Sequence, residues 1–237
     1  MRLSDFKALS FDCYGTLIDW ESGLLAALEP LRKRSRVADG ELLEAYGVVE
    51  YEVEQEFPGL AYSQLLEKVH GGLCRRLGVA EDGLEAVKLG ASVGDWPAFP
   101  DSPDALRYLN QHFKLVILSN VDRRSFAGSN RRLGVEFDFI FTAQDIGSYK
   151  PDLRNFEYLV AHLDEAGIPK DKLLHVAQSL FHDHVPANHM GIASAWIDRR
   201  HDKQGGGATV LPDPMPHLDF RFISLEELAA AHRAEQV

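Results

Sequence analysis

A regular alternation of short apolar runs and helical patterns, from residue 103 to the end of the chain, restricts the fold more than any other feature. The apolar runs have the length and composition of buried strands, and they cover 114–119, 139–142, 173–177, 193–197 and 222–224. Helical periodicity covers 103–111, 125–133, 153–166 and 182–190, and a further helix follows the last strand. Strands and helices that alternate in this way form parallel sheets covered on both faces. The sequence therefore predicts an α/β fold.

The amino-terminal part of the chain has a different pattern. It contains one predicted strand, at 6–10, and apolar residues at helical spacing then predict helices at 23–34, 41–57, 62–77 and 82–89. Pro30 predicts a kink or break, and the acidic residues of 41–57 are expected on the outer face of their helix. Two prolines within 94–101 redirect the chain toward the alternating pattern. We therefore expect a core formed by 1–17 and 97–237, with an inserted helical subdomain at 18–96.

The composition narrows the possible partners. A length of 237 residues allows one large domain, or a core with an insertion, and a net charge of −11 argues against nucleic acid and anionic membranes. We expect no secretory leader, because the first residues lack the apolar run of one, and no apolar run approaches ~18 residues, the length that spans a bilayer. Cys13 and Cys74 offer neither a disulfide framework nor metal-ligand spacing, and Cys13 is expected in the core. We expect a cytoplasmic protein that acts on a small molecule, with no nucleic-acid or membrane partner.

Asp12 is the first candidate for chemistry. It lies just after the predicted strand at 6–10, and Gly15 permits a sharp reversal of the chain soon after it. Open α/β sheets bind their ligands at the carboxyl ends of the strands, which is where Asp12 is placed. A carboxylate there can act as a covalent nucleophile, although a turn with an ordinary capping aspartate would have the same sequence.

Three further stretches place polar side chains at predicted strand ends. Ser119 and Asn120 end the strand at 114–119, Lys150 lies in a loop and is followed by Pro151, and Asp183 lies shortly after the strand at 173–177. Each is common in an ordinary turn, loop or helix start. Their order and their shared placement at strand ends predict that they surround Asp12 in one site.

With these stretches, the chain resembles the haloacid dehalogenase (HAD) superfamily, and within it the L-2-haloacid dehalogenase (type II) branch. Asp12 matches the nucleophile of this family, Thr16 the hydroxyl that steadies it, and Ser119 with Asn120 the second motif. Lys150 matches the third motif and Asp183 the acidic residue of the fourth. The resemblance implies a Rossmann-like core with a helical cap inserted after the first motif. It also suggests a homodimer.

Tyr14 separates the branches of the superfamily. Phosphatases of the superfamily carry a second aspartate two residues after the nucleophile, which protonates the leaving alcohol, whereas the dehalogenases carry tyrosine there. A phenol with a reference pKa of ~10 is a poor acid for that role, and a departing halide needs no proton. Phosphatase activity is therefore disfavoured, although it remains an alternative. A catalytically silent relative is a third alternative, which the retention of Asp12, Lys150 and Asp183 opposes.

The resemblance implies a two-step hydrolysis of a short 2-substituted carboxylic acid. Asp12 would displace the substituent at C2 to give an ester, and water would then release a 2-hydroxy acid. Asp183 and Lys150 are candidates for orienting this water, and Ser119, with backbone N–H groups near Tyr14 and Asn120, for holding the substrate carboxylate. The dehalogenase branch works without metal, so we expect neither a metal nor another cofactor.

Several residues depart from the pattern of the branch. Gln178 and Leu180 replace a serine and an asparagine, and Phe156 replaces a tyrosine. An ungapped placement puts Ala45 where the cap of the family contributes an arginine to the halide, and no arginine occurs from 37 to 74. Either the halide is held differently, or the displaced group is not a halide. Defluorination, or ring opening of a small cyclic amino acid, would use the same first step.

Histidines and tryptophans near these motifs complete the candidate list. His182 or His184 is expected to face the site and to assist the leaving group or the water, with a solvated helix face as the alternative for both and the preferred interpretation for His189. Trp20 and Trp96 lie near the two predicted linkers, where they would line the cleft or pack at a hinge. The glycine-rich segment 204–207 is expected to form a flexible loop.

Overall fold

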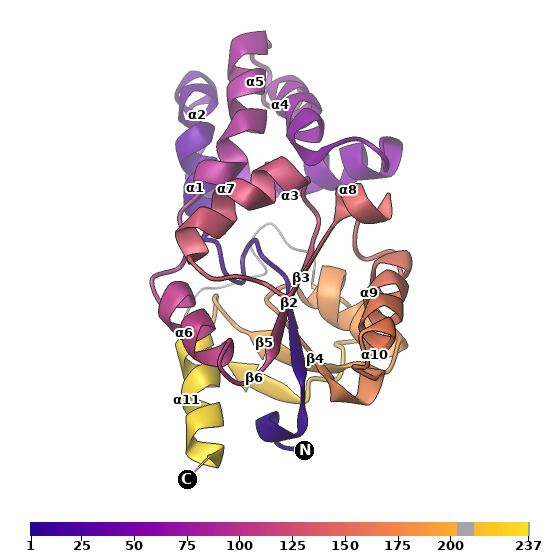
Figure 1. The fold of residues 1–237 in the computed structure, drawn as a ribbon. Helices are drawn as coiled ribbons and strands as arrows, with labels where there is room; N and C mark the ends of the chain where they lie inside the picture. The colour runs from indigo at the N-terminus through magenta and orange to yellow at the C-terminus, as the bar shows by residue number, and fades with distance from the viewer. Residues whose placement is uncertain (203–210, 237) are drawn as a thin grey trace.

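The computed structural model describes residues 1–202 and 211–236, and the predicted loop at 204–207 lies outside them. Within these ranges a six-stranded sheet forms the centre of the lower half of the molecule, and helices surround it (Figure 1). All of its strand pairs are parallel. The predicted α/β fold with a Rossmann-like parallel sheet is therefore confirmed.

The strands run in the order β3-β2-β1-β4-β5-β6 across the sheet. Their bounds are Ala8–Phe11 (β1), Lys114–Ser119 (β2), Phe139–Thr142 (β3), Leu173–Ala177 (β4), Ala193–Ile197 (β5) and Phe220–Phe222 (β6). The chain builds outward from β1 on one side as far as β3 and then crosses to the other side for β4. The strand order therefore reverses at β1, and such a point is where open α/β sheets leave a crevice for ligands.

Two helical layers cover the sheet, because alternate residues of its strands point to opposite faces. Leu115 and Ile117 of β2 pack in one core with α6 (Ser102–Leu109), α7 (Arg123–Leu133) and α11 (Leu225–Glu235). Val116 and Leu118 pack on the other face with α9 (Arg154–Glu165) and α10 (Val185–His189). Because both faces are buried, the strands are mainly apolar, and every residue of β4 and all residues of β2 after Lys114 are buried.

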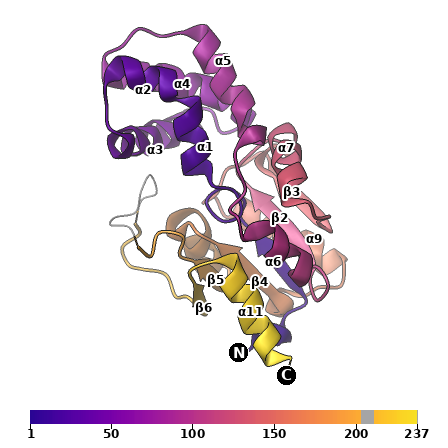
Figure 2. The same cartoon turned by 90° about the vertical axis from the view of Figure 1, so that its left-hand side faces the viewer.

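A group of helices lies beyond the carboxyl ends of the strands (Figures 1 and 2). We call them the cap helices: α1 (Trp20–Ala27), α2 (Glu29–Ser35), α3 (Asp39–Glu56), α4 (Tyr62–Leu77) and α5 (Gly83–Ser92). The predicted break near Pro30 is confirmed, since α1 ends at Ala27 and Pro30 lies in the first turn of α2. Gly78, with φ of 67°, ends α4 in a left-handed conformation. We propose that residues 18–96 act as a cap over the core.

The two segments that join the cap helices to the core lie side by side. Ile18 and Ala98 form an antiparallel bridge, the Asp19 N–H donates to the Pro97 carbonyl at 2.8 Å, and the Phe99 N–H donates to the Leu17 carbonyl at 3.0 Å. Trp96 packs so closely on α1 that a Cβ added at Gly23 would lie 2.3 Å from its ring. Gly23 is therefore required for this contact, and packing at the linkers explains the position of Trp96.

Several local predictions differ from the structure, among them the last strand, which was expected at 222–224 and is β6 at Phe220–Phe222. The short helix α8 (Ala143–Ile146), which follows β3, was not predicted. The helix expected at 182–190 is instead a π-helical turn, η4 (Leu180–His184), followed by α10. The Ser179 side chain accepts a hydrogen bond from the His182 N–H, which starts the turn earlier than the apolar pattern indicated.

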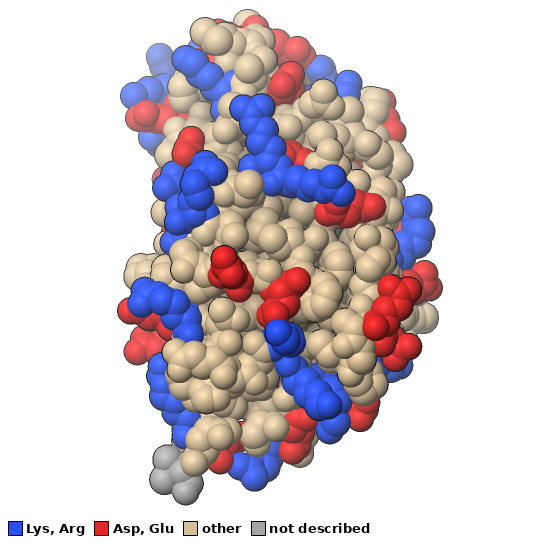
Figure 3. All heavy atoms as spheres, viewed as in Figure 1, with Lys and Arg blue, Asp and Glu red and all other residues tan. Residues whose placement is uncertain are grey.

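The surface has a mixed charge on the face drawn in Figure 3. Acidic and basic side chains are interspersed there with uncharged ones, so the net negative charge is not concentrated on this face. Among the described residues, no helix is both long and apolar enough to cross a membrane.

Candidate active site

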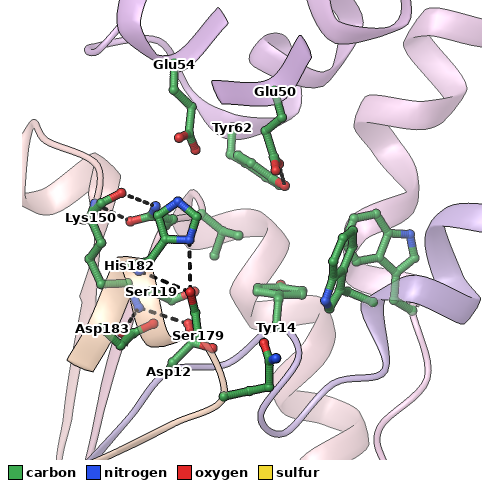
Figure 4. Close-up of a pocket in the computed structure, with 15 residues that line it drawn as sticks. Asp12, Tyr14, Glu50, Glu54, Tyr62, Ser119, Lys150, Ser179, His182 and Asp183 are labelled. Atoms are coloured by element: carbon green, nitrogen blue, oxygen red, sulfur yellow. Dashed lines mark hydrogen bonds and ion pairs between the residues drawn. The ribbon is translucent and has the colours of Figure 1, made fainter. Parts of the chain in front are cut away.

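The predicted strand-end residues converge in one cavity between the core and the cap helices (Figure 4). Asp12 directly follows β1, Ser119 is the last residue of β2, and Asp183 lies in η4 shortly after β4. Lys150 reaches the same place from the loop between α8 and α9. The cavity has a volume of about 100 Å³, which suits a small molecule.

Lys150 lies between the two carboxylates of the site. Its Nζ donates to Asp12 Oδ1 at 2.9 Å, to Asp183 Oδ1 at 2.7 Å and to the Leu118 carbonyl at 2.8 Å. The lysine is only 2% exposed. Burial opposes its charge, but the two neighbouring carboxylates outweigh this effect and raise the pKa of Lys150. The side chain is therefore a fixed cation with all three donors engaged.

Asp12 has one hydrogen-bond partner at each carboxylate oxygen. Oδ1 accepts from Lys150, and Oδ2 accepts from the Thr16 hydroxyl at 2.8 Å. The Gln178 N–H donates to the same Thr16 oxygen at 2.9 Å, which fixes the direction of the hydroxyl. Burial raises the pKa of Asp12, and Lys150 opposes this rise. A carboxylate held at both ends, yet lining the cavity, is well placed to attack a bound molecule.

Asp183 forms a hydrogen bond with His175, a residue for which no role was predicted from the sequence. His175 Nε2 lies 3.0 Å from Asp183 Oδ1, and the Ser10 hydroxyl lies 2.8 Å from His175 Nδ1. Burial alone would raise the pKa of Asp183, but Lys150 and His175 together lower it. The other oxygen, Oδ2, accepts no hydrogen bond from the described residues. It is the oxygen of Asp183 that is free to bind water.

Asn120 and Ser119 have different roles. The Asn120 side chain accepts from the Lys150 N–H at 2.6 Å and donates to the Lys150 carbonyl at 3.0 Å, so it fixes the backbone that carries the lysine. The Ser119 hydroxyl is buried, lines the cavity and has no hydrogen-bond partner among the described residues. A buried polar group without a partner is unfavourable, so Ser119 is the natural donor to a bound ligand.

Tyr14 lines the cavity, but its hydroxyl is engaged elsewhere. The oxygen lies 2.8 Å from Ser129 Oγ on α7, and the ring packs edge-to-face on Trp96. Burial raises the pKa of Tyr14 well above its usual value. The phenol is therefore held away from the position of a general acid.

The two candidate histidines of the fourth motif point in different directions. His182 lines the cavity, and its Nδ1 lies 3.1 Å from Ser179 Oγ. Burial lowers its pKa to about 4, so its ring is neutral near pH 7. His184 is fully buried and does not line the cavity, because its Nε2 bonds the Ala177 carbonyl at 3.0 Å. The structure thus does not bring His184 to the site. His189 is exposed, as the preferred interpretation held.

The residues that depart from the family pattern are also placed. Gln178 lines the cavity, whereas Leu180 is buried and Phe156 packs against His175 at 5.1 Å between ring centroids. Ala45 is buried and does not line the cavity. Cys13 is fully buried in the core, as predicted.

The side of the cavity opposite Asp12 is acidic, and this feature was not predicted from the sequence. Glu50 and Glu54 of α3 line it, with Trp20, Tyr62 and Trp96 (Figure 4). The expectation that the acidic residues of this helix all lie on its outer face is wrong for Glu50 and Glu54. Their spacing from Tyr46, which is fully buried, was the available signal, since residues four apart share a helix face.

Glu54 gives a testable consequence for stability. It is 6% exposed, and burial, reinforced by Glu50, raises its pKa well above the usual value of 4.5. A carboxyl whose folded pKa is raised destabilises the folded state at higher pH, and this cost disappears below its unfolded pKa. Glu54→Gln is therefore expected to stabilise the protein near neutral pH by at least about 1 kcal/mol, or roughly 2–4 °C in melting temperature.

Thermal unfolding of wild type and Glu54→Gln at several pH values checks this expectation. The difference in melting temperature should be largest near neutral pH and should vanish as the pH falls below about 4.5, the ordinary pKa of glutamate. Glu56→Gln, an exposed change on the same helix, is the matched control. A variant less stable than wild type near neutral pH would contradict the assignment.

Metal-dependent members of the superfamily hold Mg²⁺ through the positions of Asp12 and Asp183. Here the two carboxylates share the Lys150 ammonium, and Asp183 Oδ1 also bonds His175. Among the described residues, no group of three or more His, Cys, Asp or Glu side chains is arranged to hold a metal ion. The Lys150 ammonium therefore bonds one oxygen of each of the two carboxylates.

Comparisons with known proteins agree with this geometry. The sequence model of the haloacid dehalogenase-like hydrolase family matches residues 6–177. The chain is 27% identical to (S)-2-haloacid dehalogenase H-109 of Pseudomonas putida over 206 residues, which is 84% of this chain and 88% of that enzyme. It is 28% identical to the (S)-2-haloacid dehalogenase of Pseudomonas sp. strain YL over 198 residues, with 81% and 83% covered.

A solved structure shows the same fold. The L-2-haloacid dehalogenase from Xanthobacter autotrophicus, with chloropropionic acid covalently bound, superposes with a TM-score of 0.74 at 18% identity, and the match covers 96% of this chain and 98% of that one. The family match spans most of the core and all of the cap helices. The chain is therefore a hydrolase that belongs to the haloacid dehalogenase-like family.

Proposed function

We propose that this hydrolase displaces the C2 substituent of a short 2-substituted carboxylic acid through an ester on Asp12. The observation that carries the proposal is the buried Asp12 carboxylate, held by Lys150 and Thr16 and open to a small cavity. The relatives named (S)-2-haloacid dehalogenase and the covalent chloropropionic acid complex of a protein with this fold support it.

In the first step, a carboxylate oxygen of Asp12 attacks C2 and forms the C–O bond of the ester. The leaving group departs with the electron pair of its bond to C2, on the side of C2 opposite Asp12. The Ser119 hydroxyl, which has no partner among the described residues, donates to the substrate carboxylate. Lys150 Nζ, 2.9 Å from Asp12 Oδ1, limits the repulsion between the Asp12 carboxylate and the substrate carboxylate.

In the second step, water attacks the carbonyl carbon of the Asp12 ester. Asp183 accepts a proton of this water through Oδ2, while Lys150 and His175 hold its other oxygen. Cleavage of the ester C–O bond releases a 2-hydroxy acid, whose hydroxyl group takes up one proton of the water. The other proton is released to solvent, and the Asp12 carboxylate is restored with one oxygen from water. The first step inverts the configuration at C2. The second step leaves it unchanged, because water attacks the carbonyl carbon of the Asp12 ester and not C2.

Acid quenching tests the ester directly. Enzyme mixed with (S)-2-chloropropionate or (S)-2-bromopropionate and quenched during turnover should carry one substrate-derived group on the peptide that contains Asp12. Peptide mass spectrometry locates it, and Asp12→Asn serves as the blank. A 2-hydroxy acid formed without any adduct at Asp12 would contradict the proposal.

A phosphatase activity is expected to be negligible. Because the Tyr14 hydroxyl bonds Ser129 and its pKa is raised, this position does not offer an acid that can protonate a departing alcohol. Release of phosphate from an aryl phosphate should stay at background, with and without added Mg²⁺. Robust phosphate release that disappears in Asp12→Asn would favour the phosphatase alternative instead.

A further inference from the structure

Two glutamates of the cap helices face the nucleophile across the cavity (Figure 4). Glu50 and Glu54 lie one turn apart on α3 and line the same cavity as Asp12. Glu50 Oε1 accepts hydrogen bonds from Tyr46 at 2.6 Å and from Tyr62 at 2.5 Å. Glu54 is only 6% exposed, yet it accepts no hydrogen bond from the described residues. Like charges four residues apart on a helix repel each other, so this pair is unfavourable without a ligand.

The charges that line the cavity do not balance within the described residues. Four carboxylates line it, Asp12, Glu50, Glu54 and Asp183, against one cation, Lys150. Lys150 directs its donors to Asp12, Asp183 and a backbone carbonyl, so none remains for the glutamates. His182, with a pKa lowered to about 4 by burial, adds no positive charge near pH 7. The carboxyl groups on the half of the cavity formed by the cap helices therefore have no cationic partner among the described residues.

Aromatic rings complete the same half of the cavity. Trp20, Tyr62 and Trp96 come from the cap helices and their linkers, and Tyr14 joins them from the core. Ring faces attract cations, and carboxylates beside rings strengthen that attraction. At the opposite end, the unpartnered Ser119 hydroxyl offers a donor to an anionic group. The cavity is thus prepared for a molecule with an anionic end near Ser119 and a cationic end near the cap helices.

The direction of displacement makes this polarity chemically relevant. In an in-line displacement by Asp12 the leaving group departs from C2 on the far side, which is the side of Glu50 and Glu54 (Figure 4). A departing halide would move toward two carboxylates, whereas a protonated amine would be attracted by them. We propose that Glu50 and Glu54 form an ammonium subsite, and that the substrate presents a protonated amine to it. This inference rests on the proposed function, because it takes the direction of attack from Asp12.

The chemistry balances when the amine nitrogen is itself the leaving atom of a small strained ring. Asp12 forms its bond to C2, the C2–N bond breaks, and nitrogen keeps the electron pair as a neutral amine. Because the ring nitrogen was bound in its protonated form, the amine departs neutral beside the Glu54 carboxylate. Hydrolysis of the ester then gives the hydroxyl group and releases one proton, which converts the amine to an ammonium. The overall reaction adds one water.

Binding of unreactive ligands tests the subsite without turnover. Two matched pairs differ mainly in charge: L-proline against cyclopentanecarboxylate, and L-alanine against 2-methylpropanoate. Calorimetric titration of the wild type should show a preference of about tenfold or more for the ammonium member of at least one pair. Glu54→Gln and Glu50→Gln should each reduce this preference toward unity. Glu56→Gln, an exposed change on the same helix, should leave it unchanged.

The outcomes separate the subsite from the proposed function. No preference for the ammonium member in either pair, or a preference that survives both Glu54→Gln and Glu50→Gln, overturns the subsite. An adduct on Asp12 from 2-chloropropionate together with no ammonium preference retains the mechanism and rejects the subsite. A glutamate-dependent preference without any adduct on Asp12 retains the subsite and rejects the mechanism.

Discussion

Asp12→Asn is expected to abolish turnover while leaving the fold intact. The amide is too weak a nucleophile to form the ester, and loss of a covalent nucleophile typically lowers kcat by at least about four orders of magnitude. Since burial raises the pKa of Asp12, a neutral residue of the same shape is tolerated in the folded state. Multiple-turnover kinetics with 2-halo acids and small cyclic amino acids measure the loss, and thermal unfolding checks the fold.

Asp82→Asn provides the matched control. Asp82 caps α5 and does not line the cavity, so the same chemical change there should leave the rate unaltered. Peptide mass spectrometry confirms that the introduced asparagine has not deamidated back to aspartate during the assay. Turnover near the wild-type rate in verified Asp12→Asn protein would remove Asp12 as the nucleophile.

Lys150→Met is expected to cause the largest loss of stability among single changes at the site. It leaves the Asp12 and Asp183 carboxylates buried without their cation, and removing one partner of a buried ion pair costs about 3–5 kcal/mol. For a chain of this size the melting temperature should fall by roughly 10 °C near neutral pH. The difference from wild type should shrink on acidification, because both carboxyls then take up protons.

An exposed pair and a double variant control this prediction. Lys33→Met breaks the exposed ion pair with Glu29 and should leave the melting temperature almost unchanged, because solvent screens exposed charges. Lys150→Met combined with Asp183→Asn should recover part of the lost stability, because one uncompensated charge is removed. Equal melting temperatures for Lys150→Met and wild type would show that the lysine does not bridge the carboxylates.

The core of the fold was predictable because its signals are local. Strands buried on both faces are continuous apolar runs, and the bounds of β2, β3, β4 and β5 agree with the predicted ranges. Each run is followed closely by a polar residue, so Asp12 and Ser119 could be placed at strand ends before their contacts were known. Parallel strands then bring such residues to one edge, and Lys150 and Asp183 meet Asp12 there as expected.

The acidic side of the cavity was not predictable from the pattern of α3 alone. Helical periodicity separates buried from exposed positions, and glutamate is rarely buried without a partner. Glu50 and Glu54 therefore looked like solvent-facing residues similar to Glu52 and Glu56, which are exposed. Their position follows from the placement of α3 over the core, which only the packing of the chain determines.

The surroundings of Asp183 depended on two further features without a local signal. His175 lies within β4, so the sequence pattern indicates only that it belongs to a buried strand. Its contact with Ser10 joins β4 to β1, which is distant in sequence. The π-helical turn η4 directs His182 to the cavity and His184 to the Ala177 carbonyl. The spacing of His182 and His184 could not show which of them faces the cavity, because the residue pattern does not reveal a π-helical turn.

Isotope labelling from water tests the central role of Asp12 most directly. The enzyme is taken through many turnovers in ¹⁸O-water with the substrate that gives the highest rate, and its peptides are then measured by mass spectrometry. Attack of water on the Asp12 carbonyl predicts ¹⁸O in the Asp12 carboxylate, and in no other carboxylate of the site. In a single turnover, the 2-hydroxy acid should carry an oxygen from the enzyme and not from the solvent. Solvent ¹⁸O in the single-turnover product, with an unlabelled Asp12 after many turnovers, would contradict the account.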